Sequence, residues 1–280
     1  MWKPEHRRAA ERRGLRYPSD LSEAEWALIE PMIPPAKRGG RRREVNVREV
    51  LNAIFYVLST GCQWQALPKD LPPKSTAHHY FGLWDWDGTL ERVHHALYIE
   101  TRERAGREAS PSIAIIDSQS GKAAQKGALR STRKGFDAGK KITGRKRHIL
   151  VDTLGLLLSV AIHPANIQDR DGAGDLLRTA RRSFPFIERI FADAGYQGAK
   201  MAKVVANTGV WTLQVVKRSD AHRFVVLPKR WIVERTFAWI SRNRRLARDF
   251  ERYARTVAAF FRLAMIRIML RRLTRPSHSA

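Results

Sequence analysis

The stretch Ile113-Ala-Ile-Ile-Asp117 decides the fold, because it is a continuous apolar run that ends on a carboxylate. A second run, Ile190-Phe-Ala192, ends in the same way on Asp193. A third acid, Glu234, lies in the helix-like segment Trp231–Ile240. Short apolar runs predict buried strands, so two carboxylates are expected at strand ends and a third on a helix.

Carboxylates at two neighbouring strand ends favour a divalent metal site. Ionised carboxylates cannot lie close together without a counter-charge. Mg²⁺ supplies that charge through oxygen ligands and keeps water and phosphate in its other positions. Each acid also has an ordinary interpretation: Asp117 and Asp193 as turn formers, and Glu234 as the i,i+4 partner of Arg230. From the residues alone, both interpretations stay open.

The charge of the chain indicates a nucleic-acid partner. Its 280 residues include 52 Lys or Arg against 27 Asp or Glu, a formal net charge of +25. This excess favours nucleic acid over a merely solvated surface or a ribosome-associated protein. Acids on the core elements of so basic a chain indicate a metal ion that faces a polyanion, the arrangement with which proteins cut and join phosphodiesters.

The single cysteine, Cys62, excludes an intrachain disulfide and a cysteine-based zinc site, which fits a reducing cytosol. The first eight residues lack the apolar run of a signal peptide. Residues 256–270 are too short and too charged to cross a bilayer. We therefore expect a soluble protein of a reducing cytosol.

The first part of the chain predicts a basic arm and a helical domain. Residues 1–16, with six basic and two acidic side chains, are expected to form a flexible arm. Residues 17–109 are expected to form a helical DNA-binding domain. Its helix signals are a capping box at Ser22 and Glu25, a cap at Asn46 for a helix that ends at Gly61, and helix starts at Ser75 and Thr89.

From residue 110 the pattern predicts an α/β domain with a mixed sheet, expected over 110–255 and followed by a basic helix and tail over 256–280. The expected strands are 112–117, 145–152, 156–163, 187–193 and 211–217. The expected helices are 169–183, 198–208, 229–248 and 252–272. Asp152 is typical of a hairpin turn, and Asp169 and Asp171 of charges at a helix start.

Six groups of residues make the chain recognisable. They are Tyr17-Pro-Ser-Asp-Leu21, Gly61-Cys-Gln-Trp64, Ile116-Asp-Ser-Gln-Ser120, Gly144-Arg-Lys-Arg-His-Ile-Leu-Val-Asp152, Ala192-Asp-Ala-Gly-Tyr196, and Trp231-Ile-Val-Glu-Arg-Thr-Phe-Ala-Trp239 with Asn243-Arg-Arg-Leu246. With these motifs the chain resembles the DDE transposases of bacterial insertion sequences, in particular the insertion sequence five family. The resemblance implies a ribonuclease-H-like mixed sheet with helices, preceded by a small all-α, helix-turn-helix-like domain.

The resemblance also implies that Asp117, Asp193 and Glu234 are the catalytic, metal-binding triad. The implied cofactor is Mg²⁺, with Mn²⁺ as the alternative, at two ions per active site. Members of the wider group often carry Tyr, Arg, Glu and Lys at set spacing around the last acid. Arg230 and Glu234 fit this pattern, whereas Leu227 and Ser241 occupy the Tyr and Lys positions. Arg242 is a candidate substitute for the missing cation.

Three basic segments are predicted to contact DNA. Residues 122–147 hold ten Lys or Arg and one acid, and are expected to form a loop beside the active site. Residues 228–275 hold fourteen basic residues, and Trp231 and Trp239 among them favour core packing over base stacking. The predicted contacts of the two segments are Lys122, Arg133, Lys134, Lys140, Lys141, Arg145, Lys146, Arg147, Arg230, Arg242 and Arg245.

The third segment is a helix-turn-helix formed by helices near 46–60 and 75–86. Its recognition helix would begin at Ser75, so Lys74, Ser75 and His78 are predicted to contact DNA. The link over 61–74 is longer than is usual for this motif. His148 has two open interpretations, as a side chain that faces the active site or as a structural or phosphate-contacting histidine.

Together these features predict a transposase that binds the terminal inverted repeats of its element, cleaves the ends with metal help, and joins the 3′-hydroxyls to target DNA. The expected partners are double-stranded DNA, as repeats and target, and a second copy of the chain in a homodimer on DNA. Two alternatives stay open: a ribonuclease-H-like nuclease that only hydrolyses, and an inactive copy that binds DNA as a repressor.

Overall fold

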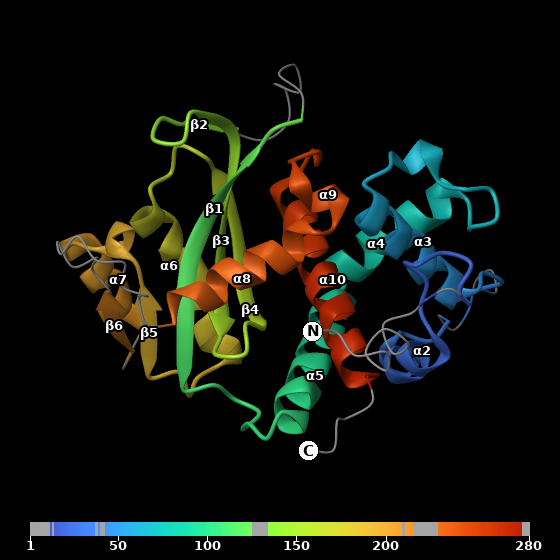
Figure 1. Cartoon of the computed structure of the whole chain (residues 1–280), viewed down its shortest axis with the longest axis horizontal. Helices are drawn as coiled ribbons and strands as arrows, with labels where there is room; N and C mark the ends of the chain where they lie inside the picture. Colours follow the sequence, from blue (N-terminus) through green and yellow to red (C-terminus); the bar gives the residue numbers. More distant parts are fainter. Residues whose placement is uncertain are drawn as a thin grey trace, which may run out of the picture. The chain divides into compact units, whose positions relative to one another are not determined.

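A computed structural model describes residues 12, 14–36, 39, 43–124, 134–208, 211–215 and 229–275 (Figure 1). The chain divides into two compact units, Met1–Ala105 with Arg262–Ala280, and Gly106–Phe261. The first unit is helical and the second contains a mixed sheet, as predicted. No helix in the described ranges is long and apolar enough to cross a membrane.

Within the described residues, the first unit contains the four helices that the sequence predicts before residue 110, together with two short 3₁₀ turns. They are α2 (Glu23–Ile29), the 3₁₀ turn η1 (Glu30–Met32), α3 (Val47–Thr60), η2 (Trp64–Ala66), α4 (Lys74–Trp86) and α5 (Thr89–Arg104). Ser22 and Glu25 form the capping box of α2. Asn46 caps α3, which ends at Gly61 in the left-handed region (φ 71°).

The core of the first unit forms where α3 packs on α4 and α4 on α5. The buried stripe of α3 repeats at helical spacing, as the sequence predicts. It consists of Val50, Leu51, Ile54, Val57 and Leu58. Phe81 and Trp84 are the large buried side chains of α4.

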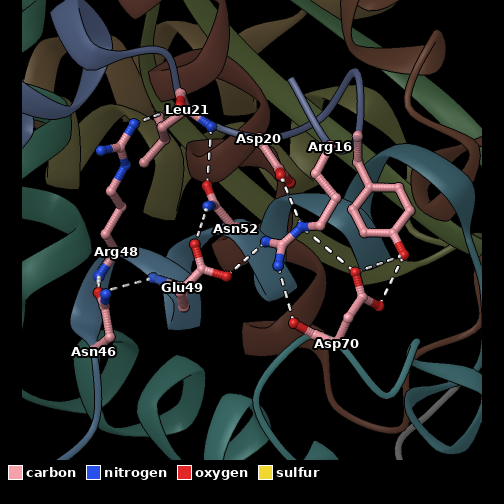
Figure 2. Close-up of polar contacts among 9 residues, drawn as sticks. Arg16, Asp20, Leu21, Asn46, Arg48, Glu49, Asn52 and Asp70 are labelled. Carbon is pink, nitrogen blue, oxygen red and sulfur yellow. Dashed lines mark hydrogen bonds and ion pairs between the residues drawn. The ribbon is translucent and has the colours of Figure 1, made fainter. Parts of the chain in front are cut away.

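A polar network around Arg16 holds the chain before α2 against α3 (Figure 2). The Arg16 guanidinium donates to Glu49 Oε2 at 2.6 Å, to the Asp70 carbonyl at 2.9 Å and to Asp20 Oδ2 at 3.3 Å. Arg12 pairs with the buried Glu25 at 2.8 Å. Arg12 and Arg16, which were expected to lie in a flexible arm, are thus held by carboxylates of the helical unit, whereas residues 1–11 and 13 of that arm lie outside the described residues.

The same network includes a buried amide on α3. Asn52 Oδ1 accepts from the Leu21 N–H at 2.9 Å, and Asn52 Nδ2 donates to Glu49 Oε1 at 2.9 Å (Figure 2). Arg48 donates to the Leu21 carbonyl at 3.0 Å. Since a buried polar group is costly without partners, these bonds fix the Tyr17–Leu21 motif to α3.

The second unit is a six-stranded mixed sheet. Its strands are β1 (Ile113–Lys122), β2 (Gly135–Asp137), β3 (Ile142–Asp152), β4 (Leu157–Pro164), β5 (Arg189–Ala192) and β6 (Thr212–Val215). The order is β2-β3-β1-β5-β6, with β4 also paired to β3. β1 is antiparallel to β3 and parallel to β5. The sequence missed β2 and made β1 too short, because the polar residues after Asp117 conceal its continuation.

The helices of this unit are α6 (Asp169–Ser183), the turn η3 (Ala194–Tyr196), α7 (Ala199–Thr208), α8 (Arg230–Ser241), α9 (Arg244–Ala247) and the start of α10 (Ala254–Leu273). The expected single helix over 229–248 is wrong, because it breaks at Asn243. The Asn243 backbone is extended, and its Nδ2 donates to the Ile240 carbonyl at 3.1 Å. A short amide side chain that binds the backbone competes with helix continuation.

The two faces of the sheet are covered by different helices. α6 packs on β3 and β4, whereas α8 crosses in front of β1 and β3 (Figure 1). Ser118 and His148, which are paired across the strands, face α6, since Ser118 Oγ donates to Asp169 Oδ1 at the start of α6 at 2.6 Å. Side chains alternate along a strand, so Asp117 and Ile149 face the side of α8.

His148 is a structural residue on the α6 face. It is fully buried, and burial together with His163 lowers its pKa to about 3. A Cβ at Gly172 of α6 would lie 2.4 Å from His148 Nε2, so the helix approaches the ring as closely as glycine permits. Of the two open interpretations, the structure supports the structural one.

Gly172→Ala is expected to destabilise the protein by about 1–3 kcal/mol, because the new methyl group overlaps a rigid, buried ring. The matched control is Gly174→Ala on the same helix. There the atom nearest to a new Cβ is the flexible end of Arg178 at 3.5 Å. Alanine should therefore raise the free energy of unfolding by about 0.5–1 kcal/mol through its higher helix propensity. Denaturant unfolding measures both, and equal effects would contradict the close packing of His148.

Candidate active site

Asp117 and Asp193 lie side by side at the carboxyl ends of the parallel pairing between β1 and β5. The last paired residues are Ile115 and Phe191, and each aspartate stands two positions later. Parallel strands are about 4.8 Å apart, and equal positions along them point to the same face. The structure therefore brings together the two acids that the sequence singled out.

Local hydrogen bonds orient each aspartate. Asp193 caps η3, and its Oδ1 accepts from the Gly195 N–H at 2.9 Å. Asp117 Oδ1 accepts from the Ser118 N–H at 2.7 Å. These bonds fix the orientation of both carboxylates within the site.

The neighbouring positive charge does not balance the Asp117 and Asp193 carboxylates. Burial, together with the charges of Asp193 and Asp169, raises the pKa of Asp117 to about 6 against the opposing Ser118 N–H and Arg230. The buried Tyr196 hydroxyl beside them has its pKa raised well above the usual value by burial first and then by the same three aspartates. A hard divalent cation held by oxygen ligands would relieve this shortage, so the donor set fits a metal ion.

Arg230 links Glu234 to the Asp117–Asp193 pair. Arg230 Nε lies 3.2 Å from Glu234 Oε1 one helical turn away, and Arg230 Nη2 lies 3.7 Å from Asp193 Oδ2. Arg230 also lowers the pKa of Asp117 against the larger effect of burial. One guanidinium thus supplies positive charge to a site formed by β1, β5 and α8.

The role of Glu234 as a third metal ligand stays a prediction. Its side chain is 56% exposed and turned to Arg230. Among the described residues, no group of three or more His, Cys, Asp or Glu side chains is arranged to hold a metal ion. For all three acids to bind a metal ion directly, Glu234 would have to release Arg230 and turn toward the aspartates.

A fourth carboxylate, Asp169, lies next to the pair. A Cβ at Gly195 would be 3.0 Å from Asp193 Oδ1 and 3.2 Å from Asp169 Oδ2. Burial would raise the pKa of Asp169, but hydrogen bonds from Ser118 and Lys146 outweigh it and lower the pKa. The sequence indicated Asp169 only as a helix-start charge, and nothing in its spacing placed it near β5.

Four of the predicted DNA contacts are buried and paired within the protein, an arrangement that does not favour contact with DNA. Lys146 Nζ pairs with Asp169 Oδ1 at 3.0 Å. Arg145 pairs with Asp249 at 3.4 Å and donates to the carbonyls of residues 251 and 252. Arg147 donates to the Leu246 carbonyl at 2.6 Å, and Arg245 pairs with Glu251 at 2.5 Å. Arg145 and Arg147 thus face α9 and the segment that follows it, whereas Lys146 lies on the opposite face of the sheet, toward α6.

The other predicted DNA contacts within the described residues keep surface exposure. Arg133 and Leu227 lie outside the described residues. Lys134 and Arg230 are half-buried, and the exposed ones are Lys122, Lys140, Lys141, Arg242, Lys74, Ser75 and His78. Lys74, Ser75 and His78 lie in the first turns of α4. This helix packs against α3, as the helix-turn-helix prediction requires.

The tryptophans of α8 do not both pack in the core as predicted. Trp231 is half exposed. The Arg235 guanidinium lies between the two rings, 4.4 Å from the centroid of Trp231 and 4.5 Å from that of Trp239. The spacing of four residues along the helix places these three side chains in one stack.

Two family models match the chain. Residues 108–269, more than half of the sequence, match the model described as "Transposase DDE domain". Residues 21–94 match the model described as "Putative transposase of IS4/5 family (DUF4096)". The boundary between the matches falls near the division between the two structural units.

Two proteins of Burkholderia cepacia are similar to the chain. One is named "Putative transposase for insertion sequence element IS402". It is 31% identical over 144 residues, which cover 49% of this chain and 67% of that protein. The other is named "Insertion element IS402 uncharacterized 16.2 kDa protein". It is 35% identical over 101 residues, which cover 34% of this chain and 67% of that protein.

Proposed function

The chain belongs to the DDE transposases of the IS4/5 family, and from this premise we propose that Asp117, Asp193 and Glu234 carry out metal-dependent cleavage and joining of DNA. The observation that supports the proposal is the side-by-side placement of Asp117 and Asp193 on β1 and β5, with Arg230 reaching both Asp193 and Glu234. The family and the mixed sheet confirm the predicted fold class and an enzyme that acts on DNA.

The three acids would hold two Mg²⁺ or Mn²⁺ ions. When bound, such ions activate an attacking oxygen and stabilise the leaving one in an in-line displacement at phosphorus. Asp117 is fixed in the sheet and Asp193 by its cap, so both present their oxygens without a change of backbone. Glu234 would turn from Arg230 toward the aspartates, and Arg230 would then face a substrate phosphate, to which a guanidinium can donate two hydrogen bonds.

The first unit would bind the terminal inverted repeats. Lys74, Ser75 and His78 stand exposed at the start of α4, where a recognition helix presents its polar groups to base edges. Lys122, Lys134, Arg133 and Arg242 would contact phosphates near the cleavage site. Because transposition brings two ends together, we propose a homodimer on DNA.

Supplying the full chain with pre-cut element ends and target DNA tests the reaction. A transposase produces joined strands through attack by the 3′-hydroxyl. Cleavage without joined product would identify a nuclease that only hydrolyses. Binding to the ends without cleavage in Mg²⁺ or Mn²⁺ would identify a DNA-binding repressor.

Glu234→Ala separates a catalytic glutamate from an ordinary ion pair. Exposed i,i+4 pairs contribute less than about 1 kcal/mol, so the free energy of unfolding should change by no more than this. Cleavage should nevertheless fall about a hundredfold, because a carboxylate that helps to hold the metal is lost. The matched control is Asp175→Ala, which removes the exposed partner of Arg178 on α6. Equal activity of the two variants would remove Glu234 from the site.

A further inference from the structure

The β2–β3 hairpin lies at one end of the sheet (Figure 1), and it carries an exposed aromatic side chain. Among the described residues, β2 pairs only with the first residues of β3, with Phe136 opposite Thr143. Phe136 is 55% exposed, although phenylalanine is among the residues most often buried. The sequence predicts a loop for this segment, and the proposed chemistry does not use Phe136.

Close backbone packing makes the base of the hairpin rigid. A Cβ at Gly144 would lie 2.0 Å from the Gly121 carbonyl oxygen, and a Cβ at Gly135 would lie 1.9 Å from Asn166 Oδ1. Both strands of the hairpin therefore press on their neighbours where only glycine fits. The exposed ring is consequently held on a firm support.

The turn of the hairpin presents positive charge. Asp137 uses its carboxylate internally, since Ser120 Oγ donates to it at 2.5 Å and the Lys140 N–H at 3.0 Å, and these bonds lower its pKa. Lys140 and Lys141 are exposed next to it. Two lysines beside an exposed ring are complementary to DNA, whose phosphates attract the cations while its bases accept an apolar side chain.

Phe136 and Asp117 project from the same face of the sheet. Phe136 is paired with Thr143 and Asp117 with Ile149. Thr143 and Ile149 are six residues apart on β3, an even number, so their side chains share a face. At about 3.4 Å per residue, the ring stands roughly 20 Å beyond the carboxylate. This is the length of about six base pairs at 3.4 Å each.

We propose that the hairpin is a DNA wedge, in which Phe136 inserts between base pairs about six steps from the phosphate that lies at Asp117 and Asp193, while Lys140 and Lys141 hold the adjacent backbone. Apolar side chains that enter a base step unstack it and bend the duplex. A bend at this distance turns the duplex toward the carboxylates. The proposal rests on the proposed function, since it takes its distance from DNA bound at the carboxylates.

The test uses the full chain without divalent metal, so that the DNA stays intact. Duplexes that span an element end carry 2-aminopurine at one position at a time, on the element side and on the flanking side. We expect a rise in fluorescence, which reports unstacking, at one step about six base pairs from the cleavage position. The side on which the rise occurs shows which DNA the wedge enters.

Three variants assign the signal to the ring. Phe136→Ala should abolish the fluorescence rise and weaken DNA binding about tenfold, as the loss of one stacking contact does. Phe136→Leu, which keeps an apolar wedge, should retain most of the signal. The matched control is Phe186→Ala, a ring that is 69% exposed at the amino-terminal end of β5, and it should behave like the wild type.

Substitution of the lysines tests the charge. Lys140→Gln with Lys141→Asn, where asparagine tolerates the left-handed backbone at residue 141 (φ 53°), should reduce the slope of log affinity against log salt by about two units. Lys203→Gln on α7 is the control for a single exposed lysine, and no comparable change is expected there.

Several results would overturn the wedge. They are a fluorescence rise that persists in Phe136→Ala, the absence of a rise at every probe position, and a Phe136→Ala variant that loses self-association without DNA. The last would assign the ring to contact between two copies. A fluorescence rise in a protein that does not cleave DNA in Mg²⁺ would support the wedge and reject the proposed cleavage chemistry. The two proposals can therefore be rejected independently.

Discussion

Alanine at Asp117 or at Asp193 should reduce DNA cleavage and strand transfer at least about a thousandfold, because each variant removes a carboxylate that is proposed to hold the metal, and metal stabilisation of the transition state is worth several kcal/mol. The activity losses of the two variants should not add in a double variant, since either substitution alone would disrupt the same proposed metal centre. Binding to the element ends should persist, because the start of α4 is untouched.

The isosteric Asp117→Asn variant distinguishes lost chemistry from lost folding. Burial and the charge of Asp193 raise the pKa of Asp117 to about 6, so at neutral pH the ionised form costs the folded state stability, and asparagine removes that cost. We therefore expect a variant that is at least as stable as the wild type and inactive. The matched control is Asp171→Ala, whose carboxylate pairs with Lys200 on α7. Retained strand transfer in Asp117→Asn would reject the metal site.

Asp249→Ala should destabilise the protein by about 3–5 kcal/mol, the usual cost of removing one partner from a buried ion pair. The Arg145 and Asp249 side chains are only 2% and 1% exposed. The Asp249 backbone also extends the sheet, since its N–H donates to the Lys122 carbonyl at 2.9 Å and its carbonyl accepts from the Ala124 N–H at 3.1 Å. The variant leaves a buried guanidinium without its carboxylate at the edge of β1.

A double replacement tests the origin of this loss. Arg145→Met with Asp249→Leu removes both charges and fills the space, so it should recover most of the stability. Urea unfolding of the single and double variants measures the coupling directly. Glu188→Ala, at the opposite end of the sheet, provides an exposed acid for comparison. A loss below about 1 kcal/mol for Asp249→Ala would show that the pair is not part of the structural core.

Local patterns determined most of the secondary structure, because caps and periodicity act between residues that are close in sequence. The capping box at Ser22, the cap at Asn46 and the turn at Asp152 all formed as predicted. The bounds of α6 match the expected 169–183. The break at Asn243 and the continuation of β1 were missed, since one depends on a side chain that binds its own helix and the other on pairing with β3.

By itself, the sequence determined two apolar strands that end on Asp117 and Asp193, and through its motifs the transposase family. Only the tertiary structure decided which side chains lie next to these acids. It also decided which basic residues are buried and which are exposed. The parallel register of β1 and β5 sets the aspartates side by side, while strand alternation and the cover of α9 turn Arg145 and Arg147 inward. Phe136, on the same face, stays exposed. Charge and composition report which side chains are present, but burial depends on which face of a strand is covered, and distant segments of the chain supply that cover.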